Sequence, residues 1–366
     1  AAGVEGNTNS LTLNFTGTTA IDGGFAGIAN LTSLGAVSLS GNVSTAGDQN
    51  YASSVTLIGD ATVGSEGTSA FVPNYANPTL AGNLSLGGFA RGVTLSSDNR
   101  YAFVADGGYG LQIIDVSNVA LPGLAGNLDT SGSAKAVTLS ADGRYAFVAD
   151  RNAGLQIIDV SNVATPTPAG SFMTIGDALS VALSSDGEYA FVATDDAAGL
   201  QIIDVSNVAS PSSVSNFATG ADTVDVMLSA DGRYAFVAAS YAGLQIIDVS
   251  NVALPTRTGT FPTTGDAYGV TLSSDGGYAF VAASYAGLQI VDVSNVASPT
   301  SAGSYATSDT AYGVTLSSDG GYAFVAIGDG GLQIIDVANV ASPTATGIFD
   351  TSGFALSVTL SSDGQY

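Results

Sequence analysis

A repeat of 44 residues is the feature that most constrains what this chain can fold into. The run Tyr-Ala-Phe-Val-Ala marks each copy, and successive copies lie 44 residues apart, or 45 in one case. The six copies begin at Tyr101, Tyr145, Tyr189, Tyr234, Tyr278 and Tyr322. Periods of this length are typical of solenoids, propellers and other arrays of one repeated unit.

Each repeat predicts four antiparallel β-strands. In one copy we expect strands at residues 269–273, 278–282, 288–293 and 300–306, with Asp275-Gly276 as the hairpin turn between the first two. The second and third strands are apolar on both faces, so both faces need cover, and stacked blades supply it. Pro recurs where the fourth strand begins, at an edge that tolerates a missing N–H. The fold class predicted is therefore all-β, a β-propeller of four-stranded blades.

The 44-residue spacing extends beyond the six complete copies. Residues 77–86, around Pro78, match a fourth strand, and residues 354–366 match a first strand and its turn. We therefore expect residues 71–366 to form a propeller whose seventh blade is split between these segments and incomplete. Its missing strands would belong to a longer polypeptide or be added by a neighbouring chain.

Residues 1–70 do not follow the 44-residue repeat. Short strand-like segments at 11–13, 36–40 and 54–58 are separated by Gly-containing turns. This spacing suits the coils of a β-solenoid, although a few strands packed on the next domain would give the same pattern. Residues 41–63 resemble the repeats of filamentous-haemagglutinin-like bacterial adhesins.

The repeats carry a family resemblance of their own. Leu-Gln-Ile-Ile-Asp-Val-Ser-Asn-Val, Val-Thr-Leu-Ser-Ser-Asp-Gly and Tyr-Ala-Phe-Val-Ala resemble the LVIVD-type repeats of bacterial surface β-propellers. They are also similar to surface-layer propellers with Tyr-Val-Thr-Asn repeats. The resemblance implies an extracellular or bacterial cell-surface location, without one shared activity.

The charge balance narrows the choice of partners. The chain has 31 acidic and 7 basic residues, a net charge of -24, and neither His nor Cys. Such a surface repels nucleic acid and anionic lipid, and it lacks the imidazole and thiolate groups of most catalytic sites. No apolar run is long enough to span a membrane, so we expect no membrane insertion. The first residues lack a signal-peptide pattern, so any export signal is expected outside this chain.

Comparison of the copies separates a constant face from a variable one. The first-to-second and third-to-fourth turns are nearly identical in all copies, whereas the second-to-third turns and the connections between blades differ. The Asp that ends each third strand, as in Asp115, either joins a ring of carboxylates or accepts hydrogen bonds from its own turn.

Variable loops on a rigid scaffold are where recognition usually lies. Asp and Tyr in these loops would suit Ca²⁺ or a sugar resting on aromatic rings. The candidate ligand-binding residues are Tyr109, Asp150, Asp195, Asp196, Asp222, Asp225, Tyr241, Asp266, Tyr268, Tyr285, Asp309 and Tyr312.

These patterns predict a non-catalytic extracellular protein, structural or adhesive, such as a surface-layer, sheath, filament or adhesin component. Its expected partners are further copies of itself, other cell-surface proteins or glycans, and Ca²⁺ is the ion most compatible with its carboxylates. The alternative is a carbohydrate-binding propeller, or a metal-dependent hydrolase or lactonase that uses Asp residues of the variable face.

Overall fold

The chain forms two compact units, residues 1–78 and 79–366, in the computed structural model. The structure describes ten short strands between residues 11 and 71, and then residues 75–195, 198–351, 353–362 and 364. We expected the boundary between the two units at residue 70, and the division by contacts falls after residue 78. Nowhere in the described part of the chain is there a helix of the length and apolarity needed to cross a membrane.

The first unit is built from parallel strands. Each strand pairs with the one three positions later, so that the sheets run β1-β4-β7-β10, β2-β5-β8 and β3-β6-β9. This order is that of a parallel solenoid with three strands in each coil. The resemblance to adhesin repeats stays a prediction. The strands are β1 (Leu11–Leu13), β2 (Thr19–Ile21), β3 (Phe25–Ile28), β4 (Leu31–Ser33), β5 (Val37–Leu39), β6 (Val43–Thr45), β7 (Gln49–Tyr51), β8 (Val55–Leu57), β9 (Val63–Ser65) and β10 (Ser69–Phe71).

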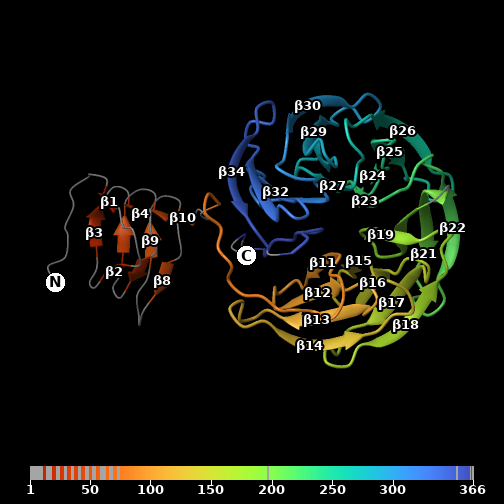
Figure 1. Cartoon of the computed structure of the whole chain (residues 1–366), viewed down its shortest axis with the longest axis horizontal. Helices are drawn as coiled ribbons and strands as arrows, with labels where there is room; N and C mark the ends of the chain where they lie inside the picture. Colours follow the sequence, from red (N-terminus) through yellow and green to blue (C-terminus); the bar gives the residue numbers. More distant parts are fainter. Residues whose placement is uncertain are drawn as a thin grey trace. The chain divides into compact units, whose positions relative to one another are not determined.

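The second unit is a β-propeller with six complete four-stranded antiparallel blades, as the repeat predicted (Figure 1). First strands of neighbouring blades contact one another, so they lie nearest the axis. The blades are β11 (Gly92–Leu95), β12 (Tyr101–Ala105), β13 (Leu111–Asp115) and β14 (Gly123–Leu128); β15 (Ala136–Leu139), β16 (Tyr145–Ala149), β17 (Leu155–Asp159) and β18 (Thr167–Phe172); β19 (Ala178–Leu183), β20 (Tyr189–Thr194), β21 (Leu200–Asp204) and β22 (Ser212–Phe217); β23 (Asp225–Leu228), β24 (Tyr234–Ala238), β25 (Leu244–Asp248) and β26 (Thr256–Phe261); β27 (Gly269–Leu272), β28 (Tyr278–Ala282), β29 (Leu288–Asp292) and β30 (Thr300–Tyr305); and β31 (Gly313–Leu316), β32 (Tyr322–Ala326), β33 (Leu332–Asp336) and β34 (Thr344–Phe349).

The constant-face turns use their own side chains as hydrogen-bond partners. Asp142 Oδ1 accepts the Ser140 hydroxyl at 2.6 Å and the Arg144 amide at 3.0 Å, and Gly143 follows with φ of 69°. These bonds, above all the one from Ser140, hold the pKa of Asp142 below its usual value. The Asp-Gly pairs are therefore turn formers, as expected.

The Asp that ends each third strand also serves its own turn. Asp159 Oδ1 accepts the amide of Ser161 at 3.0 Å as well as its hydroxyl, and Asp204 and Asp292 bond the serine two positions later in the same way. Of the two interpretations, the structure supports the local turn and not a shared ring of carboxylates.

Apolar packing between blades explains why the central strands are apolar on both faces. Phe147, Leu155 and Ile157 of the second blade share one buried cluster with Val192 and Ile203 of the third. The same arrangement recurs between the other complete blades. Each fully buried side chain of this kind stabilises the fold by roughly 1.5–3 kcal/mol relative to exposure.

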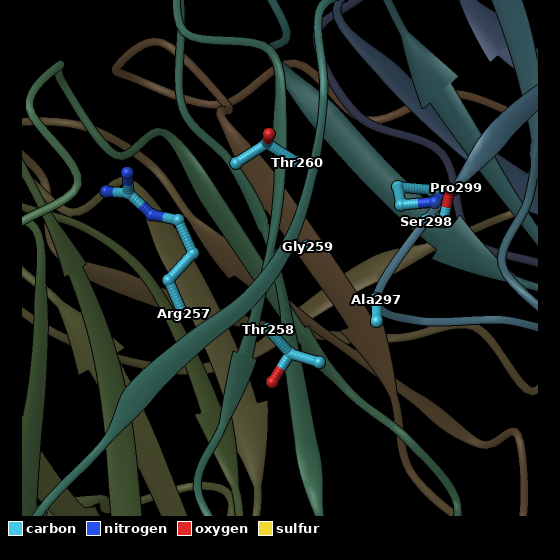
Figure 2. A pocket seen from close by; sticks show the side chains of 7 residues that line it. All are labelled: Arg257, Thr258, Gly259, Thr260, Ala297, Ser298 and Pro299. Atoms are coloured by element: carbon cyan, nitrogen blue, oxygen red, sulfur yellow. The ribbon is translucent and has the colours of Figure 1, made fainter.

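Close backbone approach at the outer strand requires a small residue. A Cβ on Gly126 would lie 2.0 Å from the carbonyl oxygen of Val163 in the next blade, and one on Gly170 would lie 1.8 Å from that of Val208. Ser215 occupies the matching place in the third blade, where its hydroxyl bonds the carbonyl of Val252. Figure 2 shows this seam at Gly259, where β26 faces the turn Ala297–Pro299 beside a hollow of about 350 Å³.

Two segments outside the six complete blades lie where strands of a further blade are expected. Gly82 lies against the carbonyl of Val119 as outer-strand glycines do elsewhere, with a 2.0 Å approach for an added Cβ. A Cβ added to Gly313 of β31 would lie 2.8 Å from the carbonyl oxygen of Leu356. In the same way, a Cβ added to Gly269 would lie 2.9 Å from the carbonyl oxygen of Tyr312. Gly82 and Leu356 therefore lie at places equivalent to outer and inner strands, although neither segment forms a strand. That the two segments belong to one split blade stays a prediction.

The first blade closes the ring through the inner of these segments. The amide of Ser362 donates to Asn99 Oδ1 at 3.2 Å, and the Asn99 amide group donates to the Ser362 hydroxyl. Cover on this side of the first blade is thinner than elsewhere: Val104 and Ile114 are 6% and 7% exposed, whereas Val148 and Ile158 in the second blade are 0% and 1%.

Gly126→Ala tests whether close approach sets the spacing of the blades. We expect it to lower the free energy of unfolding by about 1–3 kcal/mol, because the added methyl must push the next blade away. Gly123→Ala, in the same strand but with nothing within 4 Å of the added Cβ, is the matched control and should be nearly neutral. Equal effects in urea denaturation would contradict this explanation.

The incomplete blade is expected to accept a hairpin. A synthetic peptide with the sequence of residues 322–336, which forms β32 and β33 in the sixth blade, can supply the two central strands. We expect it to raise the Tm of the protein in proportion to peptide concentration, because it binds the folded state only. A scrambled peptide should leave the Tm unchanged, and equal behaviour of both peptides would refute the split blade as a strand acceptor.

Candidate functional site

The variable face is formed by the second-to-third turns and the connections that lead into each blade. Short antiparallel bridges join these two kinds of loop, as between Gly107 and Ala134 and between Arg151 and Ala178. Each turn is therefore held next to the connection that follows its blade. All but one of the twelve candidate residues lie in described parts of these loops or at the first strand that follows; Asp196 lies outside the described residues.

In the first two blades a buried carboxylate fastens the loops from inside. Asp150 is fully buried; its Oδ2 accepts the amide of Gly132 at 2.9 Å and its Oδ1 accepts the Thr130 hydroxyl at 2.8 Å. Asp106 is buried likewise and accepts the amide of Gly88 at 3.0 Å. Burial raises the pKa of both carboxyls. Asp150 was predicted as a ligand-binding residue of the variable face, whereas the structure uses both of its carboxylate oxygens as acceptors within the scaffold.

Tyrosines fasten the corresponding loops of the fourth and fifth blades. The hydroxyl of Tyr241 donates to the carbonyl of Gly220 at 2.6 Å, and that of Tyr285 donates to the carbonyl of Thr264 at 2.7 Å. Both residues are 73% exposed, and Tyr109 in the first blade is 55% exposed. Their rings therefore remain on the surface in fixed positions, as platforms on which a ligand can rest.

The acidic candidates occupy different environments. Asp195 Oδ1 accepts the amide of Asp177 at 2.7 Å, and Asp309 Oδ1 accepts the amide of Thr310 at 2.6 Å. Asp222 and Asp309 are exposed, whereas Asp266 is half-buried.

Asp225 lies at the axis instead of in a loop, as the first residue of β23. Its Oδ1 accepts the hydroxyl of Ser180 at 2.7 Å and the amide of Val226 at 2.9 Å, and its Oδ2 accepts the amide of Val270 at 3.0 Å. It thereby connects the third, fourth and fifth blades. Burial raises the pKa of this carboxyl. Its prediction as a loop ligand needs correction for the same reason as that of Asp150.

One position of the 44-residue repeat lies immediately before or at the start of each first strand. Its copies in successive blades surround the axis on the variable face. We call this set the axial ring. The N–H groups of five of its members donate to the carbonyl at the end of the second strand in their own blade, which places these five equivalently. Its members are Arg91, Lys135, Leu179, Val224, Tyr268, Tyr312 and Leu356.

The axial ring is aromatic over the fifth and sixth blades. Tyr268 and Tyr312 stack with ring centroids 5.6 Å apart and planes 4° from parallel. The ring of Phe354, from the connection into the incomplete blade, lies 5.1 Å from that of Tyr312 at an angle of 58°. Phe354 is half exposed, at 50%. The structure thus brings together two of the predicted tyrosines and adds an aromatic residue that was not predicted.

The axial ring is basic over the first two blades. Arg91 and Lys135 belong to it, and Arg151 projects from the neighbouring β16–β17 turn, where its Nε binds Asp177 Oδ2 at 2.7 Å. Burial, together with the charges of Arg91 and Arg151, lowers the pKa of Lys135 to about 8. Asp177 and Asp195 oppose this shift.

These basic residues were missed as site residues, although the sequence contains the signal. Positions 91, 135, 268 and 312 share one place in the 44-residue lattice, once the inserted residue of the third repeat is counted. Aligning the copies on that place would have assigned the two cations and the two tyrosines to one ring of equivalent positions. Comparison of the loops alone could not group these residues, since it treats each loop separately.

A metal centre has no support in the described residues. Across 75–195, 198–351, 353–362 and 364, no three Asp or Glu side chains gather closely enough to hold a metal ion. Ca²⁺ binding stays a prediction from composition.

Comparison with known proteins gives a family and a fold. The sequence pattern of the LVIVD repeat matches residues 87–130, 131–174, 175–219, 221–263, 264–307 and 311–351. No curated protein matches the chain significantly in sequence.

Solved structures share the fold at low identity. A periplasmic gluconolactonase, PpgL, from Pseudomonas aeruginosa is 18% identical with a TM-score of 0.60, over 68% of this chain and 81% of that one. A Desulfotomaculum acetoxidans protein of unknown function is 15% identical with a TM-score of 0.63, and hydrazine synthase from Kuenenia stuttgartiensis is 15% identical with 0.58. Both of these cover 75% of this chain and 90% of the other. At such identities the likeness concerns the propeller alone.

Asp150→Ala tests the buried carboxylate as a structural fastener. We expect a loss of roughly 1–3 kcal/mol in the free energy of unfolding near pH 4, because the amide of Gly132 and the Thr130 hydroxyl lose their acceptor. Asp329→Ala, at an exposed carboxylate on the same face, is the control and should change stability little.

The pH dependence of the Asp150→Ala deficit supplies a second check. A raised pKa means that the folded protein holds this proton more tightly than the unfolded chain, so the contribution of Asp150 declines as pH rises from 3.8 through the raised value. The difference between wild type and variant should therefore shrink toward neutral pH. A difference that grows with pH would show that the carboxylate is not destabilised by burial.

Proposed function

This chain belongs to the LVIVD repeat family, and from that premise we propose that it is a non-catalytic extracellular binding scaffold. It presents its variable face to glycans or proteins at the bacterial cell surface. The solenoid and the propeller are two rigid repeat structures of the kind that serve as spacers and platforms.

The observation that supports the proposal is that carboxylates form hydrogen bonds within the protein scaffold. Those of the constant face accept hydrogen bonds from their own turns, as at Asp142 and Asp159, and their pKa values are lowered mainly by serine hydroxyls. Asp150 and Asp225 fasten loops and blades from inside. These four acidic groups thus hold the scaffold instead of being available as nucleophile or metal ligand.

Exposed aromatic rings support recognition as the activity. Tyr109, Tyr241 and Tyr285 stand on one face, and the latter two are held by hydrogen bonds from their hydroxyls. Fixed, exposed tyrosines lose little conformational entropy when a sugar or protein covers them, which makes them effective binding residues. The acidic, His-free composition suits a location outside the cell without demanding it.

A propeller hydrolase is the second candidate, and one observation favours it. Asp225 has a raised pKa and lies near the axis. A carboxyl that keeps its proton can act as a general acid. Its bonds to Ser180 and to two backbone amides argue against this role, because they occupy both oxygens.

A single preparation can separate the two candidates. We expect binding to members of a glycan array, weakened about tenfold or more by the double change Tyr241→Ala and Tyr285→Ala, because stacked rings are worth about 1–3 kcal/mol in such sites. A panel of ester, lactone and glycoside substrates should show no turnover. Turnover that Asp225→Asn or Asp195→Asn abolishes, in a variant with unchanged Tm, would replace the scaffold by the enzyme.

A further inference from the structure

We propose that the axial ring binds an acidic saccharide, with its carboxylate on Arg91 and Lys135 and a neighbouring sugar ring on the aromatic residues Tyr268, Tyr312 and Phe354. This inference rests on the proposed function, because it names the class of glycan and the site that takes it.

The distribution of the basic residues is the first argument. The chain has seven of them, and all lie in described parts of the structure. Arg100, Arg144 and Arg233 form salt bridges with carboxylates of the constant face, those of Asp115, Asp159 and Asp248. Arg257 lies over the ring of Phe217 at the outer edge. The other three are Arg91, Lys135 and Arg151, and they converge beside the axis. Three of the seven basic residues of a protein with net charge -24 thus gather in one place.

Two of these three cations form no salt bridge among the described residues. Arg151 is bound to Asp177, but among the described residues no carboxylate lies within 4.0 Å of Arg91 or Lys135. The Nε of Arg91 is buried and has no hydrogen-bond partner in the described part of the chain. Lys135 is half-buried beside two like charges. An anion supplied by a ligand would satisfy both groups, since desolvated unpaired cations are costly.

The aromatic sector supplies the second half of the site. Tyr268, Tyr312 and Phe354 form a continuous series with centroid separations of 5.6 and 5.1 Å. Aromatic faces next to hydrogen-bonding groups are a usual platform for sugar rings. Phe354 precedes Leu356, which holds the seventh place in the axial ring, and Arg91 holds the first. The aromatic and basic sectors therefore lie next to each other around the axis.

Charge outside the site limits the ligand to a small acidic molecule. Asp177 and Asp195 border the basic sector, and Asp222 and Asp266 lie on the connections of the next blades. A long polyanion would meet these carboxylates, whereas a short acidic saccharide would reach only the basic sector. Recognition of one carboxylate by an Arg and a Lys is charge-assisted and specific.

Calorimetric titration with matched saccharides tests the proposal. The probes are trigalacturonate, its methyl ester, a glucuronate-containing disaccharide and a sulfated disaccharide. The ester has the same rings as trigalacturonate but no charge. We expect binding to at least one acidic probe, weakened at high salt, and binding to the ester weaker by about tenfold or more.

Variants assign the two halves of the site. Arg91→Gln should weaken binding of the acidic probe by about tenfold or more and leave the ester unaffected, because only the charged contact is lost. Tyr312→Ala should weaken both. Arg257→Gln, which removes a cation at the outer edge, is the matched control and should change neither. Unchanged Tm values for the three variants would exclude misfolding as the cause.

The pH profile gives a readout that a structural role would not produce. Because the pKa of Lys135 is about 8, affinity should fall as pH rises through and above that value. The charged groups around Lys135 are Arg91, Arg151, Asp177 and Asp195. Lys135→Arg should retain affinity at high pH, since Arg stays protonated.

The outcomes distinguish this proposal from the proposed function. Equal binding of acid and ester, insensitivity to Arg91→Gln, or failure of every acidic probe to bind would overturn the axial site. If neutral glycans still bind through the exposed tyrosines, the scaffold function survives that result. Turnover of a probe would overturn the function while leaving the assignment of the charged site open to the same variants.

Discussion

Face-to-face packing of neighbouring blades is the interaction on which the rest of the structure depends. Each sheet buries apolar side chains on both faces, and a sheet with one uncovered face would expose a stripe of Val, Leu, Ile and Phe. The distance between blades is set at the edge, where Gly126 and its equivalents admit the carbonyl of the next blade. Repetition of one contact makes the ring nearly uniform, so its polar positions can vary without loss of the fold.

Carboxylates have two structural uses in this ring, one on the constant face and the other on the variable face and at the axis. On the constant face, exposed aspartates are stabilised as anions by serine hydroxyls and backbone amides, and their pKa values fall. On the variable face Asp150 is buried, at the axis Asp225 is half-buried, and desolvation raises the pKa values of both. The first group contributes stability that is lost as pH falls through its lowered values, and the second contributes less as pH rises above 3.8.

Closure of the ring has a chemical consequence as well as a structural one. The incomplete blade brings Phe354 next to Tyr312 and leaves the first blade bonded to Ser362 through Asn99. The aromatic end of the repeat array thereby becomes the neighbour of its basic beginning. An array of the same repeats that did not close would hold these groups far apart.

The repeat alone determined the fold class, the six complete blades and the two faces of the propeller. It did so because each blade is a local unit, and strand, turn and edge signals all lie within 44 residues. Prediction of the site was less complete. Exposed tyrosines such as Tyr241 and Tyr285 were found from the variable loops, but Asp150 and Asp225 were assigned to the surface, because sequence patterns do not show which polar loop residues turn inward. The juxtaposition of Arg91 and Lys135 with Tyr268 and Tyr312 was decided only by the tertiary structure, since ring closure joins positions that are far apart along the chain.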